Sequence, residues 1–454
     1  MLTTAADNGK AVCIVLPMDS GEIVRRPPFG QHPVVGERGS DTQRRILEAA
    51  LTVFEEVGFN AARVELITKA AGCSRPSFYQ YFANKDDVFW KLARRLGYEM
   101  VQLCEQLGPV SADATGVATL TRWVDGFLAL HADYAPVFAA FQSASRSHEE
   151  LAKGSKAIDD RMSAALLAAF EASRDVDVEV SVGVTSALFG MVTRCGAMYQ
   201  RTLGDRTRTR LVTELALIVH RVMCGPIEAV NMAELVAVRL PKQPVTAETS
   251  AAPAPRRGEK TRQVLLEAGA KVLPAHGFHD SRVDDIVAVA GLSHGSFYRY
   301  FDSKEALFRT LAETASAEML ERLDAFPSVE KIGRDAESVR RWLVSWFASY
   351  RANGGIISTW QELQSADHDM VDLSDEVAKG AVQRLARRLR PRPFGDPLVD
   401  ALAVVATLER MPYSTFTLGF ITESDAVDAM ASVIHRGILG RSDPARRDQR
   451  RAHR

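Results

Sequence analysis

The 454-residue sequence has few cysteines, no excess of charge of either sign and no long hydrophobic run. Its five cysteines are scattered, with no CxxC pair and no histidines at metal-ligand spacing, which excludes a disulfide scaffold and a zinc finger. The apolar run at residues 11–18 is about half as long as a membrane span and follows a single basic residue, Lys10, so we expect neither an anchor nor a signal peptide. The net charge of −1 neither favours nor excludes nucleic acid. We expect a cytoplasmic protein without a metal or other cofactor and without a membrane partner.

The chain contains a long internal repeat. Residues 42–93 and 261–312 align without a gap at an offset of 219 and are identical at 22 of 52 positions. After a small deletion, the Thr-Leu-Gly at residues 202–204 aligns with the Thr-Leu-Gly at 417–419. A unit of about 200 residues is therefore duplicated, which is much longer than a solenoid repeat.

The sequence pattern predicts an all-α fold. Apolar residues recur three and four positions apart, and no alternation of period two is long enough for a sheet. Beyond the aligned segments, helices are predicted around residues 86–107, 117–132, 149–173, 180–203 and 208–223, and around 305–325, 336–352, 372–390, 397–416 and 424–438. Between the copies, a segment rich in Pro, Ala, Ser and Thr has the composition of a flexible linker.

Each aligned segment predicts three short helices. The first carries an apolar stripe that ends at a glycine, Gly58 or Gly277, although Pro274 should weaken the last turn in the second copy. The stripe of the first copy comprises Ile46, Leu47, Ala50, Val53, Phe54 and Val57. After the second helix, a glycine turn and a serine N-cap lead into a third helix that buries two phenylalanines and displays polar and aromatic side chains. This is the geometry of a helix-turn-helix.

Both copies resemble one known family on these residues. AGCSRPSFYQYFANKDDVF and AGLSHGSFYRYFDSKEALF are similar to the signature of TetR-type transcriptional regulators: a glycine turn, a serine, a recognition helix, an aromatic-x-Tyr-Phe element and a lysine that opens the fourth helix. The resemblance implies a repressor in which each three-helix DNA-binding domain precedes a helical domain for effector binding and dimerisation. It divides the chain into a disordered leader (1–39), two helix-turn-helix domains (40–86 and 259–305), two effector and dimerisation domains (87–224 and 306–440), a linker (225–258) and a basic tail (441–454).

The resemblance also implies which residues contact operator DNA. The start of the recognition helix would read bases, whereas the tyrosines, the lysines and the arginine before the second helix would contact phosphates. In the first copy these residues are Arg63, Arg75, Pro76, Ser77, Tyr79, Gln80, Tyr81 and Lys85; in the second they are Arg282, His294, Gly295, Ser296, Tyr298, Arg299, Tyr300 and Lys304. An alternative is that Tyr81, Tyr300 and the lysines only brace the fourth helix.

Fusion of two such units in one chain favours an intramolecular pseudo-dimer. A suitable linker raises the effective concentration of one half for the other to roughly millimolar, and the two heads differ in their base-reading residues, so we expect one chain on a non-palindromic operator. The alternative is two chains that pair through their outer faces and present four heads. A further alternative is a ligand- or partner-binding helical protein in which one or both heads are inactive.

The helical domains are expected to bind a small hydrophobic effector, because pockets between helices are mostly apolar with a few polar anchors. The candidate lining residues are Trp123, Phe127, Tyr134, Phe141, Met191, Arg194, Trp342, Trp346, Tyr350, Trp360 and Glu362. Most aromatic residues at helical spacing belong to the core, so each of these has a purely structural alternative.

Two remaining features have simple explanations. Residues 291–295 match the GxSxG of hydrolases, but that motif needs a preceding strand, and a helical pattern precedes it here. There is no P-loop, no GxGxxG and no HExxH, so we expect no enzyme activity. Cys73, at the turn, is either a redox switch or, as we prefer, a buried structural thiol.

Overall fold

The computed structural model describes residues 37–147, 149–173, 181–203, 207–225, 257–278, 280–335, 337–363, 368–389 and 395–440. Every regular element among these residues is helical and none is a strand, so the predicted all-α class is confirmed. Most of the predicted leader (1–39) and linker (225–258) and all of the basic tail (441–454) lie outside the described residues. The predicted leader and linker were each too long at their C-terminal ends, because residues 37–39 and 257–258 already belong to helices. No helix in the described part of the chain is long and apolar enough to cross a membrane.

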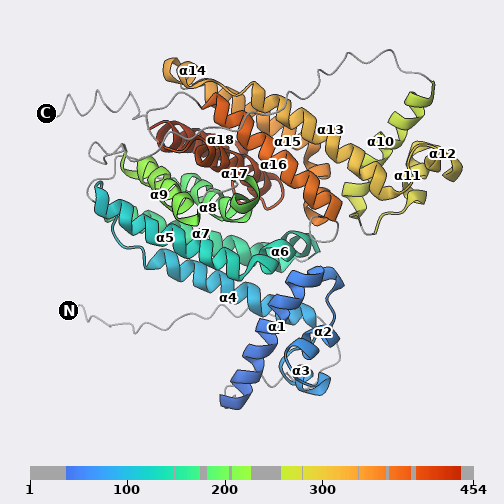
Figure 1. Ribbon diagram of the computed structural model, residues 1–454, viewed down its shortest axis with the longest axis horizontal. Coiled ribbons are helices and arrows are strands. Elements are labelled where there is room, and N and C mark those ends of the chain that lie inside the picture. Colours follow the sequence, from blue (N-terminus) through green and yellow to red (C-terminus); the bar gives the residue numbers. More distant parts are fainter. Residues whose placement is uncertain are drawn as a thin grey trace, which may run out of the picture.

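Each half begins with three helices that form a small head (Figure 1). These are α1 (Glu37–Ala61), α2 (Val64–Ala70) and α3 (Arg75–Tyr81) in the first half, and α10 (Arg257–His276), α11 (Val283–Ala290) and α12 (His294–Tyr298) in the second. Gly58 lies inside α1 and interrupts its helical geometry with a φ of 74°, whereas Gly277 directly follows α10 with a φ of 81°. Glycine adopts this conformation without strain. The predicted stop is therefore a kink in the first head and a helix end in the second. The predicted stripe of α1 is buried except for Val57, which is 39% exposed because it lies beside the break at Gly58.

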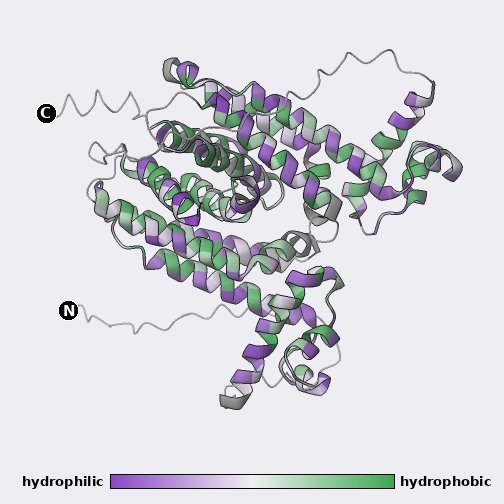
Figure 2. Cartoon of the chain, viewed as in Figure 1, coloured by the Kyte–Doolittle hydropathy of each residue, from purple (hydrophilic) through white to green (hydrophobic). Residues whose placement is uncertain are grey.

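The heads are joined to a larger helical body by two long helices, α4 (Lys85–Glu105) and α13 (Lys304–Asp324). The body of the first half contains α5 (Ala114–Asp133), α6 (Ala135–Ser147), α7 (Glu149–Glu171), α8 (Val182–Thr202) and α9 (Arg208–Cys224). That of the second contains α14 (Val329–Arg334), α15 (Glu337–Leu363), α16 (His368–Arg388), α17 (Pro397–Phe416), α18 (Glu423–Ser432) and the π-helical segment η3 (Val433–Ile438). Hydrophobic and hydrophilic residues lie on different sides of many of these helices (Figure 2).

The two bodies differ where the sequence predicted no helix. In the first half the chain breaks at Tyr134 and continues as α6, whereas in the second half α15 passes the corresponding point without interruption. Pro136 explains the break, because it lacks an amide hydrogen and its ring clashes with a preceding carbonyl inside a helix. Pro274, by contrast, lies inside α10, which continues to His276, and a Cβ at Gly355 would lie 2.6 Å from its ring. Gly355 on α15, which has no side chain, thus leaves room for the ring of Pro274.

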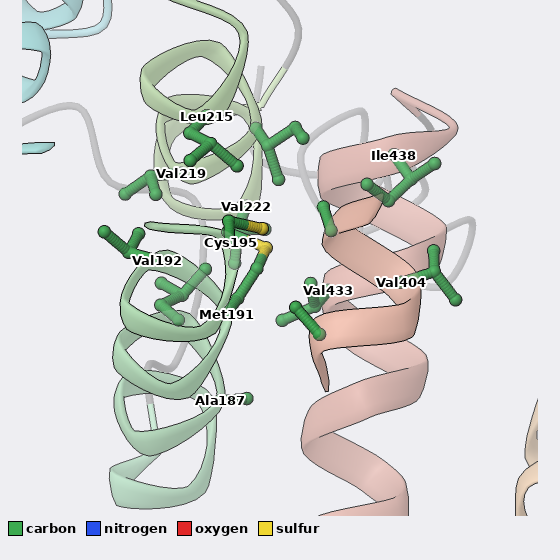
Figure 3. Packing of buried hydrophobic residues seen from close by; sticks show 14 of the residues in the cluster. Ala187, Met191, Val192, Cys195, Leu215, Val219, Val222, Val404, Val433 and Ile438 are labelled. Atoms are coloured by element: carbon green, nitrogen blue, oxygen red, sulfur yellow. The ribbon is translucent and has the colours of Figure 1, made fainter. Parts of the chain in front are cut away.

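The halves pack against each other through α8 and α9 of the first and α17, α18 and η3 of the second. Figure 3 shows Met191, Cys195 and Val222 on one side of this junction, facing Val433 and Ile438 on the other. The buried residues of both bodies form one continuous cluster. The heads have separate cores, one around Phe78 and one around Phe297.

Candidate nucleic-acid interface

The turn and recognition helix have the same construction in both heads. Gly72 and Gly291 adopt positive φ of 61° and 65° at the turn. The hydroxyl oxygens of Ser74 and Ser293 then accept hydrogen bonds, each 3.2 Å long, from the amides three residues later. These N-caps satisfy amides that a helix start otherwise leaves unpaired, so the predicted caps are confirmed.

Each recognition helix packs one face against the core of its head and exposes the opposite face. The four predicted phenylalanines, Phe78, Phe82, Phe297 and Phe301, are all at most 4% exposed. The candidate DNA-contacting residues lie on the opposite side. Those with exposed side chains or backbone are Arg63, Arg75, Pro76, Tyr79, Gln80, Arg282, His294, Gly295, Tyr298 and Arg299; those partly buried are Ser77, Tyr81, Lys85, Ser296, Tyr300 and Lys304. Each of these candidate positions has the same exposure class in both heads.

The first residue of each recognition helix is held by an acid on the helix before it. Arg75 Nη2 lies 2.9 Å from Glu65 Oε1, and His294 Nε2 lies 2.6 Å from Asp284 Oδ1. A side-chain hydrogen bond with Tyr79 and the charge of Glu65 raise the pKa of Arg75 further above its ordinary value. These pairs are exposed and weak, so either basic side chain can exchange its acid for a base edge or a phosphate at small cost.

The two lysines that open α4 and α13 are engaged with the protein itself. Lys85 Nζ donates to the carbonyl oxygens of Phe59, Asn60 and Ala62 at 2.8, 2.9 and 3.1 Å. Lys304 Nζ donates to Phe278 at 2.5 Å and to Ser281 at 2.8 Å. Both ammonium groups thereby fasten the loop after the first helix of the head. This geometry favours the bracing alternative, and phosphate contact by these lysines stays a prediction.

The remaining phosphate candidates fall into two groups. Tyr81 and Tyr300 are partly buried against the cores of their heads, as a bracing role requires. Arg63 and Arg282 immediately precede α2 and α11 in extended conformation and are exposed. The backbone amide of Arg282 is satisfied by Asp285 at 2.8 Å. Neither arginine side chain is needed for the cap, which leaves the predicted phosphate contact sterically open.

The effector candidates do not form one group. Trp123, Phe127, Met191, Trp342 and Trp346 belong to the common core of the two bodies, whereas Tyr134 and Phe141 pack with the first head and Trp360 with the second. The rings of Trp123, Phe127 and Phe189 pack against one another at tilted angles, with centroids 4.9 to 5.6 Å apart. The Glu362 side chain lies outside the described residues.

Two of the polar effector candidates, Arg194 and Tyr350, approach the junction between the halves. Arg194 forms an ion pair with Glu409. Burial, together with the nearby Glu409 charge, raises the pKa of Tyr350 well above its ordinary value. Burial and the charges of Arg194 and Arg201 lower the pKa of the neighbouring His131 to about 4. Polar groups of both halves therefore surround this part of the junction.

Sequence analysis missed two arginines that join the halves. Arg221 Nε donates to the carbonyl oxygen of Gly437 at 2.6 Å, and Arg436 Nε donates to that of Val222 at 3.1 Å. Burial lowers the pKa of Arg221 to about 10, against the raising effect of Glu214, so its guanidinium keeps its charge. An alignment of the C-terminal helices at the offset of the Thr-Leu-Gly repeat places Arg221 over Arg436, and this signal was present in the sequence.

The two features set aside in the sequence have structural counterparts. Helix α11, not a strand, precedes residues 291–295, and the Ser293 hydroxyl caps α12, so the GxSxG match is a helix-turn-helix turn. Cys73 is only partly buried, and burial raises the pKa of its thiol, which favours the protonated form; the preference for a structural thiol over a redox switch stays a prediction. Among the described residues, no three His, Cys, Asp or Glu side chains are grouped as metal ligands.

Comparison with protein families matches both heads. The model of the family described as "Bacterial regulatory proteins, tetR family" matches residues 46–92 and again residues 265–311. The chain is 47% identical over 55 residues to an uncharacterized HTH-type transcriptional regulator, YdgC of Bacillus subtilis, covering 12% of this chain and 28% of that protein. It is 31% identical over 75 residues to the HTH-type transcriptional repressor AcnR of Corynebacterium glutamicum, covering 16% and 40%.

A longer match extends beyond the head. The chain is 23% identical over 117 residues to the fatty acid metabolism regulator protein of Bacillus subtilis, covering 26% of this chain and 59% of that protein. The chain therefore spans less than two thirds of the length of each of these relatives. The two family-model matches cover the segments that carry the helix-turn-helix.

Proposed function

We propose that this chain, in which the segment matched by the tetR family of bacterial regulatory proteins occurs twice, is a tandem member of that family and a DNA-binding transcriptional repressor. Its two non-identical heads act as an intramolecular pseudo-dimer on one non-palindromic operator. A small hydrophobic effector, bound in the helical body, releases the DNA.

The observation that carries the proposal is the reciprocal pair of buried hydrogen bonds between the halves. Arg221 donates to Gly437, and Arg436 donates to Val222. Residues 221 and 222 are the sequence equivalents of residues 436 and 437 at an offset of 215. A contact from i to j that is repeated from j to i is the mark of a twofold-related interface. A chain that satisfies this interface internally has the two heads that a dimeric helix-turn-helix protein needs.

The base-reading positions support a non-palindromic operator. Arg75, Pro76 and Gln80 in the first head stand where the second head has His294, Gly295 and Arg299. Arginine pairs bidentately with guanine, whereas glutamine suits adenine. The halves of the operator therefore differ at the bases that positions 80 and 299 contact.

Helices α4 and α13 supply the coupling between effector and DNA. The N-terminal part of α4 packs in the head through Val88 and Phe89, and its C-terminal part packs in the body through Val101 and Cys104. A ligand that enters between the helices of the body displaces α4, and the Lys85 bonds carry this movement into the head. One relative is by name a regulator of fatty acid metabolism, so acyl compounds are the first effectors to test.

The test is a footprint of the purified protein on the DNA that flanks its own gene, with stoichiometry measured on the same sample. We expect one chain to protect one asymmetric site of about two helical turns, ~20 base pairs. Arg75→Ala and Arg299→Ala should each weaken binding by about 10- to 100-fold, and each should relax sequence preference in a different half of the site. Arg122→Ala, an exposed substitution on α5 of the body, is the matched control.

Three outcomes would overturn parts of the proposal. Two chains on a longer palindrome would keep the regulator and discard the pseudo-dimer. Loss of binding after Arg75→Ala alone would show that only the first head reads DNA. Absence of protection at low salt, on flanking DNA and on a randomised duplex library alike, would leave a ligand- or partner-binding protein with inactive heads.

A further inference from the structure

The helices at the junction of the halves are equivalent in sequence. Helices α8 and α17 begin at Val182 and Pro397, and α9 and α18 begin at Arg208 and Glu423; both pairs of starts differ by 215 residues. A residue that lies on the pseudo-twofold axis must face its own equivalent. A residue beside the axis must make a contact that its equivalent repeats on the other side. The junction therefore shows what each half would meet if it paired with a second copy of itself.

One ion pair lies on the axis itself. Arg194 and Glu409 are equivalent positions, since 194 and 409 differ by 215, and they face each other. Two nitrogens of Arg194, Nε and Nη2, lie 2.6 Å from Glu409 Oε2, and the side chains are only 25% and 29% exposed. A pair of first halves would set arginine against arginine here, and a pair of second halves would set glutamate against glutamate. Only unlike halves place opposite charges at this point.

A second charged contact lies beside the axis. Arg210 Nε is 3.9 Å from Asp396 Oδ2, and Asp396 is 1% exposed at the start of α17. The equivalent of Arg210 in the second half is Asp425. A pair of second halves would therefore replace the attraction of Arg210 for the buried carboxylate of Asp396 by the repulsion of a second carboxylate, which is unfavourable.

The close packing at the junction also depends on residues that differ between the two halves. A Cβ at Gly190 would lie 2.5 Å from Arg410 Cγ, so the close approach requires glycine on this side. The equivalent of Gly190 is Val405, whose side chain would overlap Arg410 in a pair of second halves.

At a second close contact the glycine belongs to the second half instead. A Cβ at Gly437 would lie 2.6 Å from Val222 Cγ2, and Val222 is itself the equivalent of Gly437. A pair of first halves would force Val222 against Val222. Overpacking of this kind is destabilising, so it disfavours the pairing of two first halves. The arginine pair on the axis disfavours the same pairing.

We propose that this junction is built to pair unlike halves and to reject like ones, with Arg194 and Glu409 as its specificity-determining residues. The partner of each half is the other half of the tandem chain, never a second copy of itself. This inference rests on the proposed intramolecular pseudo-dimer, and it adds that charge and packing at the junction determine which halves pair.

The test uses the full chain with a protease site inserted within residues 226–256. Cleavage after purification makes pairing of the halves bimolecular, so native mass spectrometry across a dilution series reports which halves pair and how tightly. We expect only the complex of one first half with one second half. Arg194→Glu or Glu409→Arg should each weaken this complex by about tenfold, the order expected for a partly buried arginine–carboxylate pair. The double swap, R194E/E409R, should restore most of the affinity.

Arg161→Glu is the matched control, because it reverses an arginine whose ion pair with Glu105 at 2.9 Å lies within the first half; it should leave the affinity of the halves unchanged. Complexes of two first halves or two second halves in the wild type would overturn the inference. Exclusive unlike pairing that neither charge reversal weakens would overturn the role of Arg194 and Glu409 and leave the pseudo-dimer intact. The footprint tests DNA binding separately, so failure of the regulator itself is distinguishable from both results.

Discussion

Replacement of Lys85 by methionine separates the two roles open to this lysine. The change keeps the length of the side chain and removes the ammonium that donates to Phe59, Asn60 and Ala62. A hydrogen bond from a charged group contributes ~1.5–3 kcal/mol. The three bonds share one ammonium, and water can reach the released carbonyls, so we expect a loss of about 2 kcal/mol, near that of one such bond.

This loss should appear as local opening of the first head. A change of about 2 kcal/mol lowers the protection of amides from hydrogen exchange by roughly 30-fold where the head opens as a unit. We expect the effect in α1 and α2, with α9 unchanged. Lys69→Met, on the exposed side of α2, is the control and should leave protection as it is.

A phosphate-binding role of Lys85 would give a different pair of results. If Lys85 serves DNA instead, Lys85→Met leaves hydrogen exchange unchanged and reduces the slope of log affinity against log salt by about 0.9, the contribution of one phosphate contact on B-DNA. That outcome would refute the bracing role inferred from the three carbonyl contacts. Lys304→Met repeats the experiment in the second head, where the acceptors are Phe278 and Ser281.

Three further substitutions test the body. Phe127→Ala, at a side chain 1% exposed between Trp123 and Phe189, should lower the free energy of unfolding by about 3–5 kcal/mol in a denaturant titration; a change within error would show that the aromatic group is loosely packed. Gly437→Ala should cost ~1–3 kcal/mol in the same assay because its Cβ would meet Val222, and a stabilised variant would contradict the close approach. Because burial lowers the pKa of His131 from 6.5 to about 4, the unfolded chain takes up its proton first, so the native state loses stability as the pH falls from 6.5 toward 4. His131→Gln should remove about 1 kcal/mol of that loss at pH 5.5, whereas identical pH profiles would place the histidine in water.

The heads were predictable from sequence because their structure is set by local signals. The glycines at positive φ, the serine caps and the buried phenylalanines each determine the structure only a few residues away, and each signal occurs in both copies of the repeat. Boundaries in the body were less accessible. The break at Tyr134 follows from Pro136, a local signal that the helical periodicity does not contain. The tolerance of Pro274, by contrast, depends on Gly355, some 80 residues later in the chain. Long-range packing of this kind leaves no periodic signal in the sequence.

The candidate site divides in the same way. The exposed residues of α3 and α12 follow from a motif, whereas the ion pairs of Arg75 and His294 with acids on the preceding helix do not. The effector candidates were chosen for aromatic type at helical spacing, and that criterion selected residues of three separate clusters. Aromatic type at helical spacing marks burial and does not identify which cavity, if any, a side chain faces.

Symmetry at the junction is kept where the acceptor is backbone and lost where side chains meet. Arg221 and Arg436 both bind carbonyl oxygens, which every residue supplies, so this pair of contacts tolerates any change in the neighbouring side chains. At positions 194 and 409 the side chain is itself the partner, and in a homodimer only a residue that tolerates its own copy can stand there. Fusion removes that condition, because each half then faces a different sequence. The arginine and glutamate at this point are therefore the expected result of a duplicated unit whose halves pair within one chain, and the same freedom allows the two heads to read different bases.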